Sequence, residues 1–407
     1  MAIDDWSRRA VMGGLASLPA LRWAAAQAPQ GQAPQGKAIR VGQTLSLTGP
    51  FAQTGLIHQI VSEVFVAQVN AKGGWLGRPV EYVLLDDQSK PDVARELYER
   101  LLGVEKVDLI LGPYGTAAIL AAMGVAQRYK KLFIQNTMGT PALATYAWHF
   151  SANVLGANPD VTNAGILMDA FAATPHPPKT AALLILKFPS TQFFAGGARK
   201  VFPQRGAKIV LDLEYDQGTR DFTAIADRVK NANADFLWMG CLGLDGNLLL
   251  EAMSKIDYRP PRHFYLFPSP SIAEAPGAEN ALGVTNFDDG PPYTDDPVGG
   301  AFARDFDARA KAANMPFPHV DSQAANEYAG WQILDAAIRA TKSIDDAKLA
   351  AWLEHAEVKT VVGTRDFTGA HHTAERDMTE LKQVQQARWV TVWPAADASP
   401  GHKLIAP

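Results

Sequence analysis

The sequence is poor in the features that mark several large classes of protein. Cysteine occurs once, at Cys241, inside an apolar segment, which excludes an internal disulfide and argues against a cysteine-based metal site. The net charge is −4, from 38 basic and 42 acidic residues, so no basic excess points to nucleic acid. Beyond the N-terminal region, no apolar run reaches the length of a membrane span. We therefore expect neither cysteine chemistry nor nucleic-acid binding.

The patterns of common catalytic and phosphate-binding sites are also missing. The chain has no Walker or G-x-G-x-x-G pattern and no G-x-S-x-G pattern. Asp86 and Asp87 resemble a paired carboxylate, but adjacent strand residues face opposite ways, so turn formation or helix capping explains them better. His371 and His372 lack metal-ligand spacing. The sequence favours a binding protein over an enzyme, with no cofactor and no metal.

The first 28 residues have the composition of an export signal. Arg8 and Arg9 precede an apolar run at 10–21, and an alanine-rich segment ends at Ala28. Positive charge, a short apolar segment and an A-x-A site predict cleavage near Ala28 and a periplasmic location. The paired arginines match the core of a twin-arginine signal, and a Sec signal is the alternative. We interpret residues 29–37, rich in Pro, Gln and Gly, as a disordered leader.

Predicted strands and helices alternate along the chain at the spacing of an α/β fold. We expect strands at 39–47, 80–85, 107–111 and 132–135, and helices at 57–70, 91–102 and 116–128. The pattern restarts after Pro178, with a strand at 180–186 and a helix at 193–202. Such alternation indicates parallel sheets covered on both faces by helices. Residues 297–353 are helix-rich, and strand-like segments at 360–362 and 389–393 close the chain.

Two segments repeat one order of elements. Residues 77–112 and 206–240 each run glycine, strand, acidic turn, helix, Asp, strand, glycine. Although any two β-α-β units share much of this order, the repeat favours two similar lobes. Two lobes leave a cleft between them, and in open parallel sheets the ligand binds beyond the carboxyl ends of the strands. We therefore look for the site in the loops that follow the strands.

The most informative of these loops lies in the stretch 109–123, LILGPYGTAAILAAM. An apolar strand ends at a glycine, and a helix begins at Thr116 just after Tyr114 and Gly115. The amides of 115–117, the Thr116 hydroxyl and the helix dipole suit a carboxylate. Simple N-capping by Thr116 is the alternative.

Other strand-end loops also carry polar or aromatic residues. Loop 46–55, with Gln53 and Thr54, suits a ligand, and a solvated turn with a helix cap is the alternative. Loop 136–141 adds polar donors. In the second half, segment 188–194 carries aromatics that, if exposed, would close over an apolar ligand, or would otherwise be ordinary core. Segments 241–245 and 268–271 follow later strands.

Three segments, 39–55, 69–87 and 107–112, resemble a known family when taken together. They are similar to the periplasmic substrate-binding proteins of branched-chain amino acid ABC transporters, the leucine/isoleucine/valine-binding protein family. The combination of T-G-P, N-x-x-G-G-x-x-G and D-D carries the resemblance, which covers roughly residues 38–395.

The resemblance implies a type I periplasmic binding fold. Its two Rossmann-like α/β lobes are joined by a three-segment hinge and close on a ligand. On this likeness, lobe 1 comprises residues 38–157 plus 288–364, and lobe 2 comprises 158–287 plus 365–407.

The resemblance also implies roles for individual residues. The family's carboxylate-binding serine corresponds to Thr116, and its neighbouring donor loop to Thr137, Met138 and Gly139. A lid tyrosine corresponds to Phe193, a first-loop tyrosine to Thr54 and a second-lobe tyrosine to Leu242. With the loop residues above, the predicted ligand-binding residues are Gln53, Thr54, Tyr114, Gly115, Thr116, Thr137, Met138, Gly139, Phe193, Leu242 and Ser269.

One departure from the family pattern bears on the ligand. The glutamate that neutralises the ammonium of a bound amino acid corresponds to Ser269, and an unpaired buried ammonium is strongly disfavoured. We therefore expect a carboxylate with an apolar or aromatic body rather than an α-amino acid. Asp245 is the alternative source of an acidic group.

The resemblance implies a monomeric solute-binding protein that delivers its ligand to an ABC permease and its ATPase subunits. A periplasmic sensor that reports lobe closure to a regulatory partner is one alternative. An exported enzyme on the same fold is a second.

Overall fold

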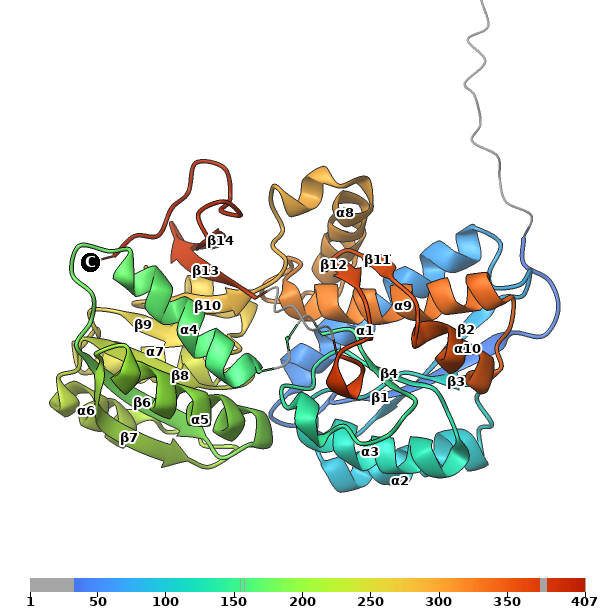
Figure 1. The fold of residues 1–407 in the computed structure, drawn as a ribbon, viewed down its shortest axis with the longest axis horizontal. Helices are drawn as coiled ribbons and strands as arrows, with labels where there is room; N and C mark the ends of the chain where they lie inside the picture. Colours follow the sequence, from blue (N-terminus) through green and yellow to red (C-terminus); the bar gives the residue numbers. More distant parts are fainter. Residues whose placement is uncertain (1–32, 154, 157, 374–378, 407) are drawn as a thin grey trace, which may run out of the picture.

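The structure is a computed structural model that describes residues 33–406 except 154, 157 and 374–378. The export signal predicted at 1–28 and the start of the predicted leader lie outside the described residues. Two α/β lobes lie side by side (Figure 1). The chain passes from lobe 1 to lobe 2 between β5 (His149–Ser151) and α4 (Pro159–Ala172), and it crosses twice more, before α8 (Pro297–Ala312) and before β13 (Glu380–Gln385).

Lobe 1 is built around a parallel sheet in the order β2-β1-β3, which an isolated bridge between Leu111 and Ile134 connects to the pair β4-β5. Helices cover both faces of this sheet (Figure 1). Its other elements are β1 (Ile39–Leu45), α1 (Ala52–Ala71), β2 (Val80–Asp86), α2 (Pro91–Gly103), β3 (Leu109–Ile110), α3 (Thr116–Tyr129), β4 (Phe133–Gln135), α9 (Ser322–Thr341), α10 (Asp346–Leu353), β11 (Val358–Thr360) and β12 (Gly363–Arg365).

Lobe 2 has one sheet in the order β14-β13-β10-β9-β8-β6-β7. Its strands pair in parallel from β10 to β7, while β13 and β14 add an antiparallel hairpin at one edge. Its other elements are β6 (Thr180–Leu186), α5 (Pro189–Gln204), β7 (Lys208–Tyr215), α6 (Thr223–Ala232), β8 (Phe236–Gly240), α7 (Asp245–Lys255), β9 (His263–Tyr265), β10 (Leu282–Thr285) and β14 (Arg388–Trp393).

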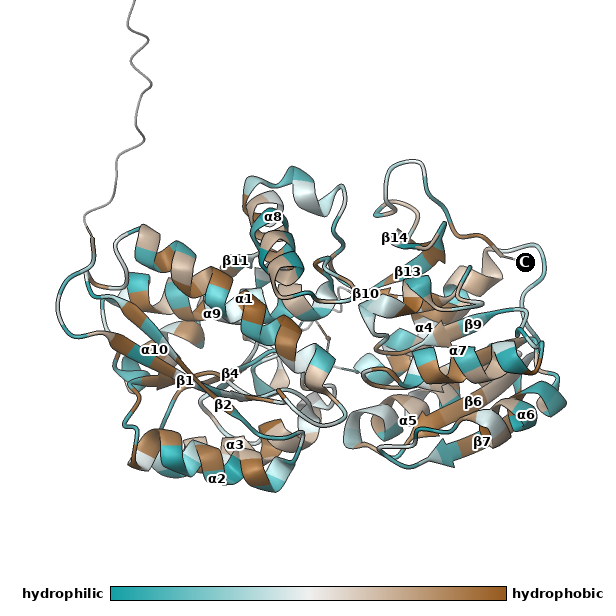
Figure 2. Cartoon of the chain, turned by 180° about the vertical axis from the view of Figure 1, so that it is seen from behind, coloured by the Kyte–Doolittle hydropathy of each residue, from teal (hydrophilic) through white to brown (hydrophobic). Residues whose placement is uncertain are grey.

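The sequence of each strand explains its place in the sheet. Strand β6, TAALLIL, is buried at every position after the first, as expected for a central parallel strand covered on both faces. Its neighbour β7, KIVLDLEY, alternates between exposed and partly buried positions, which suits an edge strand with one covered face. Figure 2 shows hydrophobic strands inside the lobes and helices that carry both polar and hydrophobic residues around them.

The prediction of two similar α/β lobes is confirmed. In lobe 1, β2 and β3 flank β1, and in lobe 2, β7 and β8 flank β6. The two segments with a shared sequence order therefore form equivalent units, β2-α2-β3 and β7-α6-β8. The strand-end loops of both lobes face the region between them (Figure 1).

The chain stays with lobe 1 beyond residue 364, the end expected from the resemblance. The Phe367 ring packs edge-on against Phe150 with the ring centroids 5.3 Å apart, and the His372 ring stacks on Phe150 at 4.6 Å. Because Phe367 is buried in the core of lobe 1, the third crossing begins after this contact.

His319, in the segment before α9, carries a pH-dependent contribution to stability. Its Nδ1 atom lies 3.0 Å from Asp289 and 3.5 Å from Asp307, and these two carboxylates raise the pKa of His319 from 6.5 to about 9. A histidine whose pKa is higher in the folded state than in the unfolded state stabilises the folded protein. This contribution is fully present at a pH below the pKa of the unfolded state, and it is lost as the pH rises through the pKa of the folded state.

We therefore expect the His319→Asn variant to be less stable than the parent chain at low pH and nearly equal to it at high pH. Urea unfolding of both proteins at about pH 6 and about pH 10 measures this difference. A difference that is the same at both pH values would contradict the assignment.

Candidate functional site

A pocket of about 620 Å³, counting space open to solvent, lies where the two lobes meet. Lobe 1 contributes Tyr114, Gly115, Asn136, Thr137, Ser322, Gln323 and Asn326. Lobe 2 and the crossing segments contribute Asn153, Leu155, Phe188, Ser190, Leu242, Phe267, Val284, Thr285, Asn286 and Thr379. All of these described residues are uncharged. The wall from lobe 1 is mainly polar, and lobe 2 adds two phenylalanine rings and a leucine.

The loops after β3 and β4 are tied together at the polar end of this pocket. The Gly115 N–H donates to Thr137 Oγ1 at 2.9 Å, and the Gly139 N–H donates to Thr116 Oγ1 at 3.1 Å. Gly115 adopts φ 83°, a conformation that glycine tolerates best. It is the N-cap of α3 and makes no side-chain cap, so Thr116 is not a simple N-cap residue.

This arrangement decides which groups can meet a ligand. The Gly115 amide and the Thr116 hydroxyl oxygen are both used within the protein, and the Thr116 side chain is fully buried. Thr137 Oγ1 accepts one hydrogen bond, and its own hydroxyl hydrogen is still able to donate. The first amides of α3 have no partner within the helix. Thr137 is therefore the side-chain donor best placed at this corner.

The structure brings four of the predicted residues, Tyr114, Gly115, Thr137 and Leu242, into the pocket wall. The others lie around it. Thr116, Met138 and Gly139 lie behind the corner, with Met138 in the core of lobe 1. Phe193 is half-buried beside Phe194. Thr54 lies beside the Tyr114 hydroxyl, and Gln53 and Ser269 meet between the lobes.

Segment 188–194 is core and helix rather than an exposed aromatic lid. Helix α5 begins at Pro189, where the fixed φ of proline favours the first helical position. Phe188 and Phe194 are buried, and Phe194 packs against Phe267 at 5.4 Å between centroids. Of the two interpretations of this segment, ordinary core therefore holds for Phe194, whereas Phe188 is buried but also lines the pocket.

The lobes touch along a seam beside the pocket. The Phe51 ring of lobe 1 packs edge-on against Tyr114 at 5.5 Å and against Phe188 of lobe 2 at 5.8 Å. Ser269 Oγ donates to Gln53 Oε1 at 3.1 Å across the same seam. The structure therefore shows a conformation with the lobes in contact around the pocket.

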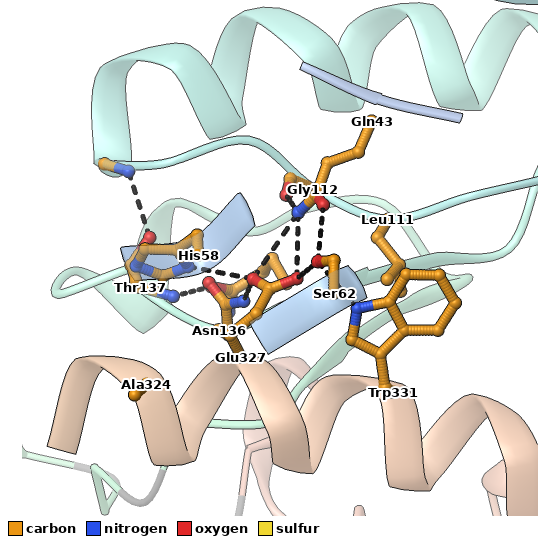
Figure 3. A network of polar contacts seen from close by, with 12 residues as sticks. Gln43, His58, Ser62, Leu111, Gly112, Asn136, Thr137, Ala324, Glu327 and Trp331 are labelled. Atoms are coloured by element: carbon orange, nitrogen blue, oxygen red, sulfur yellow. Dashed lines mark hydrogen bonds and ion pairs between the residues drawn. The ribbon is translucent and has the colours of Figure 1, made fainter. Parts of the chain in front are cut away.

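A buried polar network (Figure 3) includes Asn136 of the pocket wall. The Glu327 carboxylate, fully buried on α9, accepts hydrogen bonds from Ser62 Oγ at 3.0 Å and Gln43 Nε2 at 3.2 Å. It also lies 2.9 Å from His58 Nδ1 and bonds to Asn136 Nδ2. These contacts link β1, α1, the loop after β4 and α9.

This network fixes the orientation of Asn136 in the pocket wall. Because only the amide nitrogen can donate to a carboxylate, Asn136 Nδ2 must face Glu327. Its Oδ1 atom is buried and has no hydrogen-bond partner in the described chain. Asn136 therefore lies in the pocket wall with its amide nitrogen fixed by Glu327 and its amide oxygen unpaired among the described residues.

Most of the other wall residues were not predicted from the sequence. They come from the crossing segments, such as Asn153 and Asn286, and from the first turn of α9, such as Asn326. The Asp321 side chain caps α9 by accepting from the Ala324 N–H at 3.1 Å. This cap signal could have drawn attention to the helix start, although not to its place in the pocket.

Asp245, the alternative source of an acidic group, lies outside the pocket wall. Its Oδ2 atom accepts a hydrogen bond from the Tyr215 hydroxyl at 2.8 Å. Burial raises the pKa of Asp245 to about 6. Nearby, Cys241 is fully buried, and burial raises the pKa of its thiol. Neither side chain reaches the pocket.

The Asp86 and Asp87 pair organises the first loop rather than a catalytic centre. Asp87 accepts from Thr44 Oγ1 at 3.0 Å and from Ser46 Oγ at 2.8 Å, and Asp86 accepts from Thr48 Oγ1 at 2.7 Å. The turn interpretation is confirmed, because the Gln88 N–H donates to Asp86 Oδ1 at 2.8 Å and the Ser89 N–H donates to Asp87 Oδ1 at 3.0 Å. Capping of α2 is wrong, because the N-cap residue is Lys90 and the helix has no side-chain cap.

The described residues form neither a metal-binding cluster nor a membrane-spanning helix. His371 and His372 each bind a backbone carbonyl, those of Ala144 and His149, and no group of three potential metal ligands occurs among the residues described. None of the described helices combines the length and apolarity needed to cross a bilayer.

Comparisons with known proteins agree with this architecture. A sequence model described as "Periplasmic binding protein" matches residues 38–387. The leucine-, isoleucine-, valine-, threonine- and alanine-binding protein of Pseudomonas aeruginosa is 24% identical over 213 residues, 52% of this chain and 56% of that protein. The Leu/Ile/Val-binding protein BraC3 of Rhizobium johnstonii is 24% identical over 80% of this chain and 86% of its own.

Solved structures share the fold. A solute-binding protein of an ABC transporter from R. palustris, in complex with benzoate, superimposes with a TM-score of 0.74 at 20% identity. The match covers 91% of this chain and 99% of that one. The resemblance inferred from the sequence is confirmed.

Proposed function

This chain belongs to the periplasmic binding protein family, and from that premise we propose that it captures a small carboxylate with an apolar or aromatic body between its two lobes. The observation that carries this proposal is the composition of the interlobe pocket. Its described wall is uncharged, with hydroxyls and amides on lobe 1 and the rings of Phe188 and Phe267 on lobe 2.

This wall suits a carboxylate better than a zwitterion. Hydrogen bonds to a charged group contribute roughly 1.5–3 kcal/mol each, so the Thr137 hydroxyl and the first amides of α3 can hold an anion without an arginine. The described wall contains no carboxylate that could pair with the ammonium of a ligand. The R. palustris protein bound to benzoate supports an aromatic acid as ligand, whereas the names of the curated relatives keep branched-chain amino acids as the alternative.

We propose that binding is capture without catalysis. The ligand docks on the lobe 1 corner, and lobe 2 closes over it by hinge motion in the three crossing segments. The closed form then has a higher affinity for the ligand than the open form.

The proposal extends to location and partners. The predicted export signal would deliver the protein to the periplasm, where an ABC permease with its ATPase subunits would accept the closed, liganded form. The protein would act as a monomer.

Calorimetric titration of the chain lacking residues 1–28 with benzoate, 4-hydroxybenzoate and L-leucine tests the proposed ligand class. We expect an aromatic acid to bind with one-to-one stoichiometry and at least about tenfold more tightly than leucine, a difference of about 1.4 kcal/mol. Micromolar binding of leucine without binding of either acid would overturn the proposed ligand class.

The Thr137→Val variant tests the proposed corner. It keeps the shape of the side chain but removes the hydroxyl, so we expect benzoate affinity to fall by roughly 10- to 150-fold, the equivalent of one charge-assisted hydrogen bond. Thr364→Val, an exposed position on β12, is the matched control and should bind as the parent does. Equal affinities for both variants would exclude Thr137 as a ligand donor.

A further inference from the structure

A second cavity, of about 790 Å³ including space open to solvent, lies at the hinge rather than between the strand-end loops. Its walls come from the crossing segment after β10, the segment before α9 and the β13–β14 hairpin. The apolar part of the wall comprises Phe287, Phe317, Val320, Ala387 and Trp389, and the charged part comprises Glu274, Asp288, Asp289, His319, Asp321, Lys382 and Arg388. Unlike the interlobe pocket, this cavity has charges of both signs.

One of these charges is a buried lysine. Lys382 on β13 is only 2% exposed, and its ammonium lies 4.7 Å above the Trp389 ring. No carboxylate of the described chain lies within ion-pair distance of it. Burial lowers the pKa of Lys382, and the more distant carboxylates of Asp321, Asp288 and Asp289 offset this effect only in part. A buried cation without a close anion is unfavourable. We therefore expect a ligand carboxylate to stabilise the Lys382 ammonium.

The opposite charge comes from Asp321, at the start of α9. Its Oδ1 atom is used to cap the helix, whereas Oδ2 is buried and has no hydrogen-bond partner among the residues described. Asp289 in the same wall is different, because it is already paired with His319 at 3.0 Å and with Arg388 at 3.7 Å. Asp288 in the same wall accepts a hydrogen bond from the Asp289 N–H at 2.8 Å, and burial raises its pKa to about 7. Of the four carboxylates that line this cavity, Asp321 is the one with a buried oxygen atom that lacks a hydrogen-bond partner, so we take it as the partner for a ligand's cationic group.

We propose that the hinge cavity is a second binding site, for a small zwitterion whose carboxylate faces Lys382 and whose ammonium faces Asp321. The Phe287, Phe317 and Trp389 side chains then enclose an apolar body, so an α-amino acid with an apolar side chain is the simplest ligand of this class. Such a ligand neutralises both buried charges at once. The proposal does not depend on what the interlobe pocket binds.

Calorimetry on the chain lacking residues 1–28 tests this site, with L-phenylalanine and L-leucine as probes. Each probe is titrated to about 10 mM, once alone and once with the interlobe pocket saturated with benzoate. Lys382→Met keeps the apolar stem and removes the charge. Asp321→Asn removes the charge and keeps a good N-cap residue. Arg388→Met is the matched control, because it removes a cation that lines the same cavity but is largely exposed.

We expect one equivalent of at least one probe to bind in the presence of benzoate. Lys382→Met and Asp321→Asn should each weaken this binding by about tenfold or more, and Arg388→Met by less than about threefold. Thermal unfolding shows whether each variant is folded. The proposal is overturned if neither probe binds, if the probe displaces benzoate one for one, or if the folded Lys382 and Asp321 variants bind as the parent does.

The two proposals fail in different ways. If benzoate does not bind but an amino acid binds in a Lys382-dependent manner, the ligand proposed for the interlobe pocket is wrong and the hinge site stands. If benzoate binds and the amino acids do not, the hinge site is wrong and the interlobe pocket stands.

Discussion

Replacing Glu327 by alanine is expected to lower the free energy of unfolding by about 3–5 kcal/mol, the cost typical of breaking a buried charged pair. Glu327 is fully buried, and its carboxylate is the common acceptor for Gln43, Ser62 and Asn136 and the partner of His58. Alanine leaves Asn136 Nδ2 and His58 Nδ1 without their partner, whereas Gln43 Nε2 keeps the Gly112 carbonyl oxygen at 2.8 Å. Each unsatisfied buried group costs about 1–3 kcal/mol. Alanine also leaves a cavity between α1 and α9.

Urea unfolding of the parent and of Glu327→Ala measures this loss. Glu63→Ala is the matched control, because Glu63 is on α1 but its side chain is 42% exposed and its pair with Arg309 spans 3.7 Å. Such a surface pair contributes about 0–1 kcal/mol, so the control should change little. A loss below about 1 kcal/mol for Glu327→Ala would show that the network is not essential to lobe 1.

Replacing Gly139 by valine is expected to weaken ligand binding without unfolding either lobe. Gly139 of lobe 1 faces α5 of lobe 2, and a Cβ atom there would lie 2.8 Å from Ser190 Cβ and 3.2 Å from Phe194 Cε2. Both contacts form only when the lobes meet, so the clash raises the free energy of the closed form alone. Overpacking costs typically 1–3 kcal/mol, which corresponds to roughly 5- to 150-fold weaker binding.

Benzoate titration measures the effect of Gly139→Val on ligand binding and lobe closure, and urea unfolding measures its effect on the stability of the fold. Gly124→Val is the control, since a Cβ at this exposed position of α3 meets nothing within 4 Å. We expect Gly139→Val to lose affinity and keep its urea midpoint, and Gly124→Val to keep its affinity. Unchanged affinity in Gly139→Val would mean that the ligand binds without this contact between the lobes.

The α/β architecture could be predicted because local sequence and final packing agree in most elements. The apolar run 180–186 forms β6 without a change of boundary, and the predicted helix at 116–128 differs from α3 by one residue. Helix α1 begins five residues before its predicted start. Gly55 was interpreted as part of a loop, but a Cβ there would lie 2.1 Å from the Ser46 carbonyl oxygen, so the first turn of α1 needs glycine to pack closely.

Much of the candidate site could not be predicted, because the chain assembles it from distant segments. Thr137 and Tyr114 follow strands and were identifiable from that position. Asn286 and Asn326, bonded to each other at 2.9 Å, lie on a crossing segment and a helix with no local ligand signal. Glu327 looks like an ordinary helical acid in the sequence, and only the packing of α9 against α1 and β1 places it in the core.

The residue at which the chain leaves lobe 1 for the third time also could not be predicted from local sequence. Phe367 follows a short hairpin, and nothing in its neighbours shows that it packs onto Phe150, more than two hundred residues earlier. The charged residues of the hinge cavity could not be predicted either. Lys382 and Asp321 line one cavity only because β13 lies beside the segment that precedes α9.

A crystal structure with benzoate bound would test the central claim most directly. The account predicts the carboxylate beside Thr137 and the start of α3, with the ring between Phe188 and Leu242 and the lobes in contact. A bound acid elsewhere, with the Gly115–Thr137 corner filled by protein side chains, would contradict it.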